Sequence, residues 1–251
     1  MQKTGWATRI GALALLLALA AAGAMFIGAT VTRYSSGEDK LALFGWVPLG
    51  FQGALLALAV AVVAIVWRLV SRRGTVKPAL IALLVAGVPA TWLASQIADA
   101  RELPMIHDAT TDPVDLPQFA ALEVETPSVR GLDGGAAEWR RLHEDAYGDL
   151  EPLVVPGTVP DVAATAAELL EQRGWEVADT AVALDGGRIE ATATVSYYRF
   201  KDDVVLRFSP NGEGAVRVDM RSVSRVGLSD LGYNAQRIRD FLADLRGAVA
   251  R

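Results

Sequence analysis

The stretch IGALALLLALAAAGAMFIGATVT, residues 10–32, is predominantly apolar and contains no charged residue. Two more charge-free stretches follow it, Leu41–Trp67 and Pro78–Ala98. Each is as long as the roughly 20 apolar residues that an α-helix needs to cross the core of a bilayer. Charged side chains would be costly in that core, and the three stretches contain none. We therefore expect residues 1–100 to form a region of three transmembrane helices.

The charges divide the chain at the same place. Residues 1–103 contain nine Lys or Arg against four Asp or Glu, whereas residues 104–251 contain 15 against 25. An acidic domain repels nucleic acid, so neither DNA nor RNA is expected as a partner. The chain has no cysteine, which excludes disulfide frameworks, thiolate zinc sites and cysteine nucleophiles.

The loop between the second and third stretches carries four basic residues and no acidic one. These residues are Arg68, Arg72, Arg73 and Lys77. Loops of this kind stay on the cytoplasmic side of a membrane, and this one orients the whole chain. We predict a multi-pass protein of the bacterial cytoplasmic (inner) membrane, with a cytoplasmic N-terminus and an extracytoplasmic C-terminal domain.

The first stretch has a second interpretation as a cleaved signal peptide. Lys3 and Arg9 precede an apolar run that ends in the small residues Ala20–Ala24, which is the order found in such peptides. The length of the run favours a retained anchor. The other two spans would leave the C-terminal domain on the same side in either case. Since no stretch contains an ionisable residue, a proton relay or a voltage sensor within them is not expected.

The rest of the chain is predicted to hold a connector and one domain. Residues 101–133 are rich in turn-forming residues, and we expect the connector there. Residues 134–251 form the expected extracytoplasmic α+β domain. Its expected helices cover Ala136–Tyr147, Asp161–Arg173 and about Leu231–Val249. Asp161 is the expected N-cap of the second helix, and Gly174 its C-terminal stop.

After Gly174 the apolar residues alternate with polar ones, as they do in strands with one buried face. The expected strands are Trp175–Asp179, Thr180–Ala183, Ile189–Tyr198, Val204–Phe208 and Ala215–Ser224. Turn signals at Gly186–Gly187 and Asn211–Gly214 predict antiparallel neighbours. The predicted fold is therefore an anchor of three transmembrane helices plus an α+β domain with an antiparallel sheet packed by helices on one face.

The last expected strand presents Arg217, Arg221 and Arg225 on one face, because side chains two residues apart share a face. Guanidinium groups bind carboxylates and phosphates through paired hydrogen bonds, so this face is a candidate anion site. In the alternative interpretation, the arginines pair with carboxylates across the sheet. Those carboxylates would belong to Glu190, Asp202 and Asp203.

The segment after this strand leads directly into the last helix and contains Asp230 and Asn234. Amides exposed at a helix start bind anions, and Arg225 lies shortly before them. Capping of the helix by Ser229 or Asp230 is the competing explanation. The candidate ligand-binding residues are Arg217, Arg221, Arg225, Asp230 and Asn234.

His107, Asp108 and Asp112 form a polar cluster soon after the third span and are the candidate catalytic residues. A histidine beside two carboxylates suggests acid–base or metal chemistry, but the only other histidine is His143 and no helical metal-binding spacing is present. No metal site and no cofactor is therefore predicted. In the alternative, these side chains bond loop amides.

Three motifs together resemble a known family. They are HDATTD at residues 107–112, FKDDVV at 200–205 and RSVSRVGLSDLGYNA at 221–235. In these residues the chain resembles domain of unknown function family 1499 over residues 104–248. The resemblance implies a domain boundary but no reaction, ligand or cofactor. Some members carry a cysteine near the domain start, which this chain lacks.

The sequence thus predicts a non-enzymatic integral membrane protein that presents an extracytoplasmic binding or interaction module in the cell envelope. Its expected partners are the lipid bilayer and either an envelope protein or an anionic ligand. Two alternatives stay open. One is a membrane-anchored, metal-assisted hydrolase that uses the region of His107, and the other is an accessory subunit of a transporter.

Overall fold

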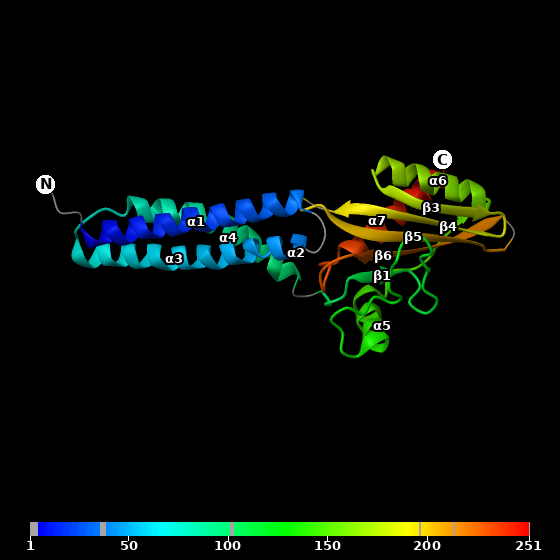
Figure 1. Ribbon diagram of the computed structural model, residues 1–251, viewed down its shortest axis with the longest axis horizontal. Coiled ribbons are helices and arrows are strands. Elements are labelled where there is room, and N and C mark those ends of the chain that lie inside the picture. The colour runs from blue at the N-terminus through cyan, green and yellow to red at the C-terminus, as the bar shows by residue number, and fades with distance from the viewer. Residues whose placement is uncertain (1–4, 36–38, 101–102, 196, 213, 251) are drawn as a thin grey trace. The chain divides into compact units, whose positions relative to one another are not determined.

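The computed structural model describes residues 5–35, 39–100, 103–195, 197–212 and 214–250 (Figure 1). The chain divides into two compact units, Met1–Arg101 and Glu102–Arg251. The first unit is helical and the second combines a sheet with helices.

The described residues of the N-terminal unit form three helices that are long and apolar enough to cross a membrane, as predicted. They are α1 (Trp6–Tyr34), α3 (Trp46–Ser71), which the short α2 (Asp39–Phe44) precedes, and α4 (Lys77–Ala100). α1 packs against both of the other long helices, and these also contact each other. The predicted membrane anchor is therefore a packed three-helix unit.

Small residues fill the interior of this unit, whereas large apolar residues point outward. Buried alanines of all three long helices form its core. Leu16, Phe26 and Leu84 are among the large side chains that are more than half exposed. Small residues let helix backbones approach closely, which is how helices associate when lipid already surrounds their apolar side chains. A Cβ atom added at Gly50 of α3 would lie 2.8 Å from the carbonyl oxygen of Ala21 in α1.

Replacing Gly50 by valine is therefore expected to separate α1 from α3 and lower the thermal stability of the unit. Gly23→Val is the matched control, because a Cβ atom at Gly23 would meet no atom within 4 Å. The measurement is the helical circular-dichroism signal of the detergent-solubilised chain on heating. Equal melting of the two variants would contradict the close α1–α3 contact.

The C-terminal unit is built on a six-stranded antiparallel sheet. The strands are β1 (Asp108–Thr110), β2 (Leu153–Pro156), β3 (Glu176–Ala183), β4 (Gly186–Val195), β5 (Phe200–Pro210) and β6 (Ala215–Ser224). Their order is β1-β6-β5-β4-β3, and β2 pairs with the same edge of β6 as β1 does. The helices that the structure describes in this unit are α5 (Gly135–Tyr147), α6 (Val159–Gln172) and α7 (Tyr233–Val249).

α6 and α7 pack on one face of the sheet, and the main core lies beneath them. α6 contacts β3 to β5, whereas α7 contacts β1, β2 and β6. Alternate residues such as Ile189, Leu206 and Met220 point into this core and are almost fully buried, together with Ile238 and Phe241 of α7. The predicted fold class, an antiparallel sheet packed with helices, is confirmed. The predicted stop of the second helix is also seen, since Gly174 takes a left-handed φ of 67° directly after it.

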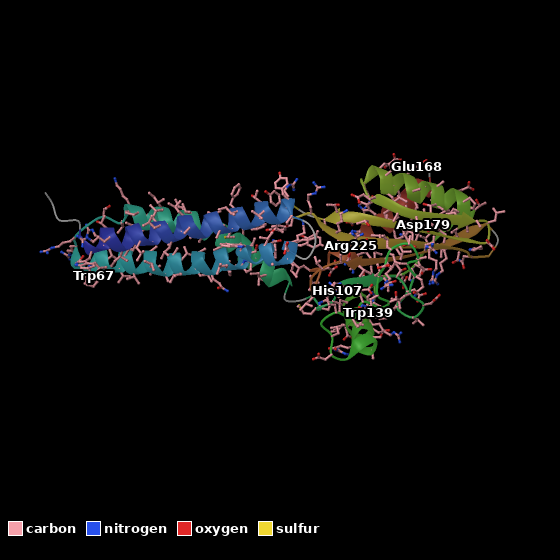
Figure 2. The ribbon with its side chains drawn as sticks, in the orientation of Figure 1. Trp67, His107, Trp139, Glu168, Asp179 and Arg225 are labelled. Atoms are coloured by element: carbon pink, nitrogen blue, oxygen red, sulfur yellow. The ribbon has the colours of Figure 1, made fainter. Side chains whose placement is uncertain are left out.

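α5 packs beside the short strand β1. The indole Nε1 of Trp139 donates to the carbonyl oxygen of Asp108 at 3.1 Å, and His143 Nε2 accepts from the amide of Thr110 at 3.0 Å. Figure 2 labels Trp139 on this helix. Both α5 side chains are buried. The side chains of α5 thus cover the edge strand and hold it in place.

Three expectations about the elements were wrong. The two strands expected over Trp175–Ala183 are the single strand β3, which a bulge between Val177 and Asp179 interrupts. The N-cap of α6 is Thr158, whose hydroxyl accepts from the amide of Asp161. β1 and β2 were not predicted, because three and four residues are too few to show a period. β1 lies within residues 101–133, where we expected a connector.

Candidate functional site

The second face of the sheet is polar, and the segment Thr111–Arg130 covers part of it. Side chains that alternate with the core residues point to this face, among them Glu190, Asp219 and Arg221. All three are fully buried. Charged groups are buried in this way only when they are paired and hydrogen-bonded. Their charged partners come from the strands, and the covering segment supplies further hydrogen bonds.

Arg221 forms the central contact of this layer. Its Nε and Nη2 atoms lie 3.0 and 2.7 Å from the two carboxylate oxygens of Asp108. Its other N–H groups donate to Thr126 Oγ1 and to the carbonyl oxygens of Pro117 and Glu125. Because all five donors of the guanidinium are then in use, Arg221 has none left for a ligand in this structure.

Glu190 fixes the covering segment from the neighbouring strand. Its carboxylate accepts hydrogen bonds from the amides of Ala120, Ala121 and Leu122 at 2.7 to 3.2 Å. The guanidinium of Arg188 lies 2.7 Å from the same carboxylate. One buried carboxylate thus orders three consecutive residues that the sequence presented as loop.

Arg217 is also paired with carboxylates. Its Nη2 atom lies 2.8 Å from Asp112 and 2.9 Å from Asp219. Asp219 also binds Arg207 at 3.1 Å. The hydrogen bond between Arg217 and Asp219 raises the pKa of Arg217 above the ordinary arginine value. The arginines of this face thus pair with carboxylates, as in the alternative interpretation. However, the carboxylates that bind Arg217 and Arg221 are not among the three named there.

Each of the three candidate catalytic residues binds a different side chain. Asp108 binds Arg221, and Asp112 binds Arg217. His107 Nε2 lies 2.8 Å from the hydroxyl of Ser128, and both side chains are buried. Burial and, to a lesser extent, the charge of Arg130 lower the pKa of His107, which keeps the imidazole neutral at neutral pH. Among the described residues, no group of three or more His, Cys, Asp or Glu is arranged to hold a metal ion.

Asp230 and Asn234 connect the start of α7 to the sheet. The carboxylate of Asp230 accepts from the amides of Gly232 at 3.1 Å and Asn234 at 2.6 Å. The side chain of Asn234 bonds Ser222 and the carbonyl oxygen of His107. Burial raises the pKa of Asp230. Both residues therefore have partners within the domain. Asp230 caps the start of α7, as in the competing explanation.

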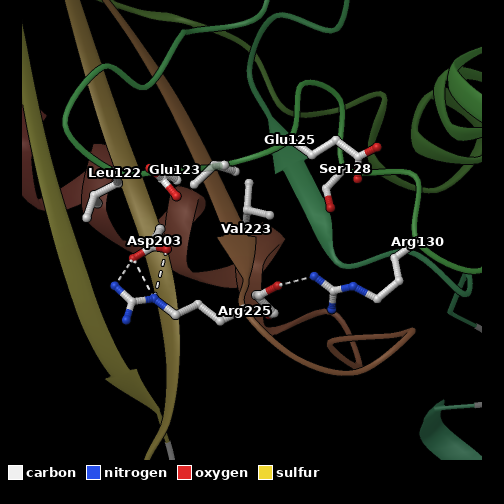
Figure 3. Close-up of a pocket in the computed structure, with 10 residues that line it drawn as sticks. Leu122, Glu123, Glu125, Ser128, Arg130, Asp203, Val223 and Arg225 are labelled. Atoms are coloured by element: carbon white, nitrogen blue, oxygen red, sulfur yellow. Dashed lines mark hydrogen bonds and ion pairs between the residues drawn. The ribbon is translucent and has the colours of Figure 1, made fainter. Parts of the chain in front are cut away.

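An open pocket of about 510 Å³ lies between the covering segment and the end of β6 (Figure 3). We call it the Arg130–Arg225 pocket, after the two arginines in its wall. Its other lining residues are Leu122, Glu123, Val124, Glu125, Ser128, Asp203, Val223 and Ser224. Figure 3 shows Arg225 beside Asp203 at one side of the pocket and Arg130 at the other.

Both arginines keep donors available within the part of the chain that the structure describes. Arg225 binds Asp203 through Nε and Nη2 at 2.8 to 3.1 Å, but its Nη1 atom has no partner there. Its side chain is 43% exposed. Arg130 donates from Nη1 to the carbonyl oxygen of Gly227 at 2.8 Å, and its Nε atom has no partner there. Of the predicted ligand-binding residues, the structure places only Arg225 in the wall of this pocket.

Arg130 and Ser128 were missed because they lie in the expected connector. Nothing in their local pattern indicates that they meet the end of β6, which is about a hundred residues later in the chain. A basic residue in a stretch rich in proline and glycine was the only available signal.

Comparison with known proteins gives the family of this domain. The family model described as "Protein of unknown function (DUF1499)" matches residues 108–245. The chain belongs to the DUF1499 family. The match extends from β1 into α7 and so includes the buried polar layer and the pocket. No curated protein matches the chain closely enough to add a name or an activity.

Replacing Arg221 by leucine is expected to lower the free energy of unfolding by about 3–5 kcal/mol, because Asp108 would remain buried without its partner. Arg141→Ala removes an exposed i,i+4 pair with Asp145 and is expected to cost less than about 1 kcal/mol. Chemical unfolding followed by far-ultraviolet circular dichroism measures both. A combined Arg221→Leu, Asp108→Leu variant should regain part of the loss. Equal stability of the two single variants would contradict this assignment.

Proposed function

We propose that this protein is a membrane-anchored binding module of the bacterial cell envelope. In this proposal the three apolar helices hold the chain in the cytoplasmic membrane, and the DUF1499 domain stands on the extracytoplasmic side. The domain holds an anionic group of an envelope component in the Arg130–Arg225 pocket. The observation that carries the proposal is the open pocket with available guanidinium donors from both arginines.

The size and lining of the pocket support a small ligand. About 510 Å³ is within the usual range for small-molecule sites. Leu122, Val124 and Val223 provide apolar contacts beside the charged groups. Glu123 and Glu125 also line the pocket and would repel a highly charged anion. This combination favours one phosphate or carboxylate on a largely uncharged body.

Arg225 is suited to contact the anionic group. Its hydrogen bond to Asp203 raises the pKa of Arg225, so the guanidinium stays charged. That carboxylate also holds the side chain in one orientation and leaves Nη1 available in the described part of the chain. Preorganised donors of this kind reduce the entropy that binding must overcome.

A hydrolase centred on His107 lacks comparable support. Its two candidate carboxylates, Asp108 and Asp112, are held by arginines of β6. The buried imidazole instead bonds the hydroxyl of Ser128, whose amide donates to Asp108 at 2.8 Å. These contacts attach the covering segment to β1.

The orientation in the membrane is testable because the chain has no cysteine. Leu184→Cys lies in the exposed turn between β3 and β4, and Val76→Cys lies in the basic loop between α3 and α4. The reagent is membrane-impermeant and reacts with thiols, and the bacterial cells are treated so that it reaches the outer side of a sealed cytoplasmic membrane. It is expected to label position 184 and not position 76. Labelling of position 76 alone would place the domain in the cytoplasm and overturn the orientation.

Ligand binding is testable with glucose 1-phosphate, which carries one phosphate on a neutral body. Isothermal titration of the detergent-solubilised chain is expected to show saturable binding. Arg225→Gln should weaken that binding by about tenfold or more, the usual effect of losing a hydrogen bond to a charged group. Arg239→Gln is the matched control, since Arg239 also makes a two-atom contact with a carboxylate, that of Asp149, outside the pocket. Absence of saturable binding, or equal weakening in both variants, would overturn the site.

A further inference from the structure

We propose that one end of the DUF1499 domain is a lipid-binding surface that rests in the interface of the bilayer into which the chain is anchored. This membrane-contact end consists of Leu103–Ile106, Gly227–Tyr233 and Tyr197, which lies between β4 and β5. The proposal is independent of any ligand in the Arg130–Arg225 pocket.

Large apolar side chains at this end are exposed although the domain has a well-formed core. The exposed fractions are 59% for Met105, 49% for Leu228, 51% for Leu231, 51% for Tyr233 and 52% for Tyr197. Scattered single apolar residues are normal on a protein surface, but several in adjoining loops mark an interaction site. Tyrosine is also a residue that favours the boundary between lipid and water.

The first two segments are packed together as one surface. The amide of Asp230 donates to the carbonyl oxygen of Ile106 at 3.2 Å, and the hydroxyl of Ser229 donates to that of Pro104 at 3.4 Å. The side chain of Leu103 lies against Gly232, where an added Cβ atom would approach it to 3.1 Å. Leu228 similarly lies against Gly131. These contacts fix the two segments to each other and to the domain, while Met105, Leu231 and Tyr233 stay more than half exposed.

Strand pairing places the tyrosine-containing turn at the same end of the sheet. Val195 pairs with Phe200 around that turn, and Asp202 pairs with Ser224, the last residue of β6. The segment that follows β6 therefore starts beside the turn. The turn between β3 and β4, with Leu184, is at the opposite end of β4, about 30 Å away along ten residues of strand.

The covalent connection argues that lipid, rather than another protein, covers this end. α4 ends at Ala100, and Met105 follows five residues later. Five residues span at most about 17 Å even when fully extended. The polar interface on each side of a bilayer core is about 5–8 Å thick, so with Ala100 at the edge of the core Met105 lies within this interface or at most about 12 Å beyond it. The apolar surface thus begins at Met105, in the segment that joins α4 to the domain.

Site-specific quenching tests the proposal with the full chain. Met105→Cys, Leu228→Cys and the control Leu184→Cys each carry a single bimane label on a chain without other cysteines. Leu184 is the matched control because it is an exposed leucine at the far end of the sheet. Each variant is placed in vesicles of phosphatidylcholine with ordinary or brominated acyl chains, and circular dichroism confirms that it is folded.

The expected result is several-fold quenching by brominated lipid at positions 105 and 228 and none at position 184. Aqueous iodide should show the reverse order. Weak lipid quenching at all three positions would overturn the proposal. So would shielding of position 228 from iodide without quenching by lipid, because that result would assign this end to a second copy of the chain or to a protein partner.

Discussion

The DUF1499 domain depends on the buried pair between Arg221 in β6 and Asp108 in β1. Neither side chain is exposed, and the guanidinium also binds the covering segment at Pro117, Glu125 and Thr126. A charge buried without its partner is strongly destabilising. The pair is therefore stable only when β6, the edge strand β1 and the covering segment are all in place. The edge strand, the covering segment and the wall of the pocket all follow from this requirement.

The sheet has two interiors of different chemistry. On one face, apolar side chains pack against α6 and α7. The hydrophobic effect that stabilises this packing does not depend on the orientation of particular atoms. On the other face, Glu190, Asp219 and Arg221 are buried against the covering segment and depend on directed hydrogen bonds. The first interior sets the architecture, and the second positions the loops that carry the proposed function. The helical unit follows a third rule, with small residues inside and large apolar ones outside.

The sequence predicted the elements whose pattern is long enough to repeat. The boundaries of β6 match the expected Ala215–Ser224, because apolar and polar residues alternate there from Val216 to Arg221. The short strands β1 and β2 have no such repeat, and the bulge in β3 interrupted its pattern. Arg225 was identified as a candidate from its spacing along β6. Arg130 was not, since its meeting with β6 is a contact between distant parts of the chain.

The sequence by itself determined the three apolar helices, the alternating strands and the family of the domain, because each of these is written in a local period or motif. The tertiary structure alone decided which carboxylates bind Arg217 and Arg221. The strand pattern predicts that Arg217, Arg221 and Arg225 share a face. Arg225 binds Asp203 on the neighbouring strand, whereas Asp112 and Asp108, which bind Arg217 and Arg221, come from more than a hundred residues earlier. Such pairings depend on where the covering segment lies over the sheet, and no local pattern records that position.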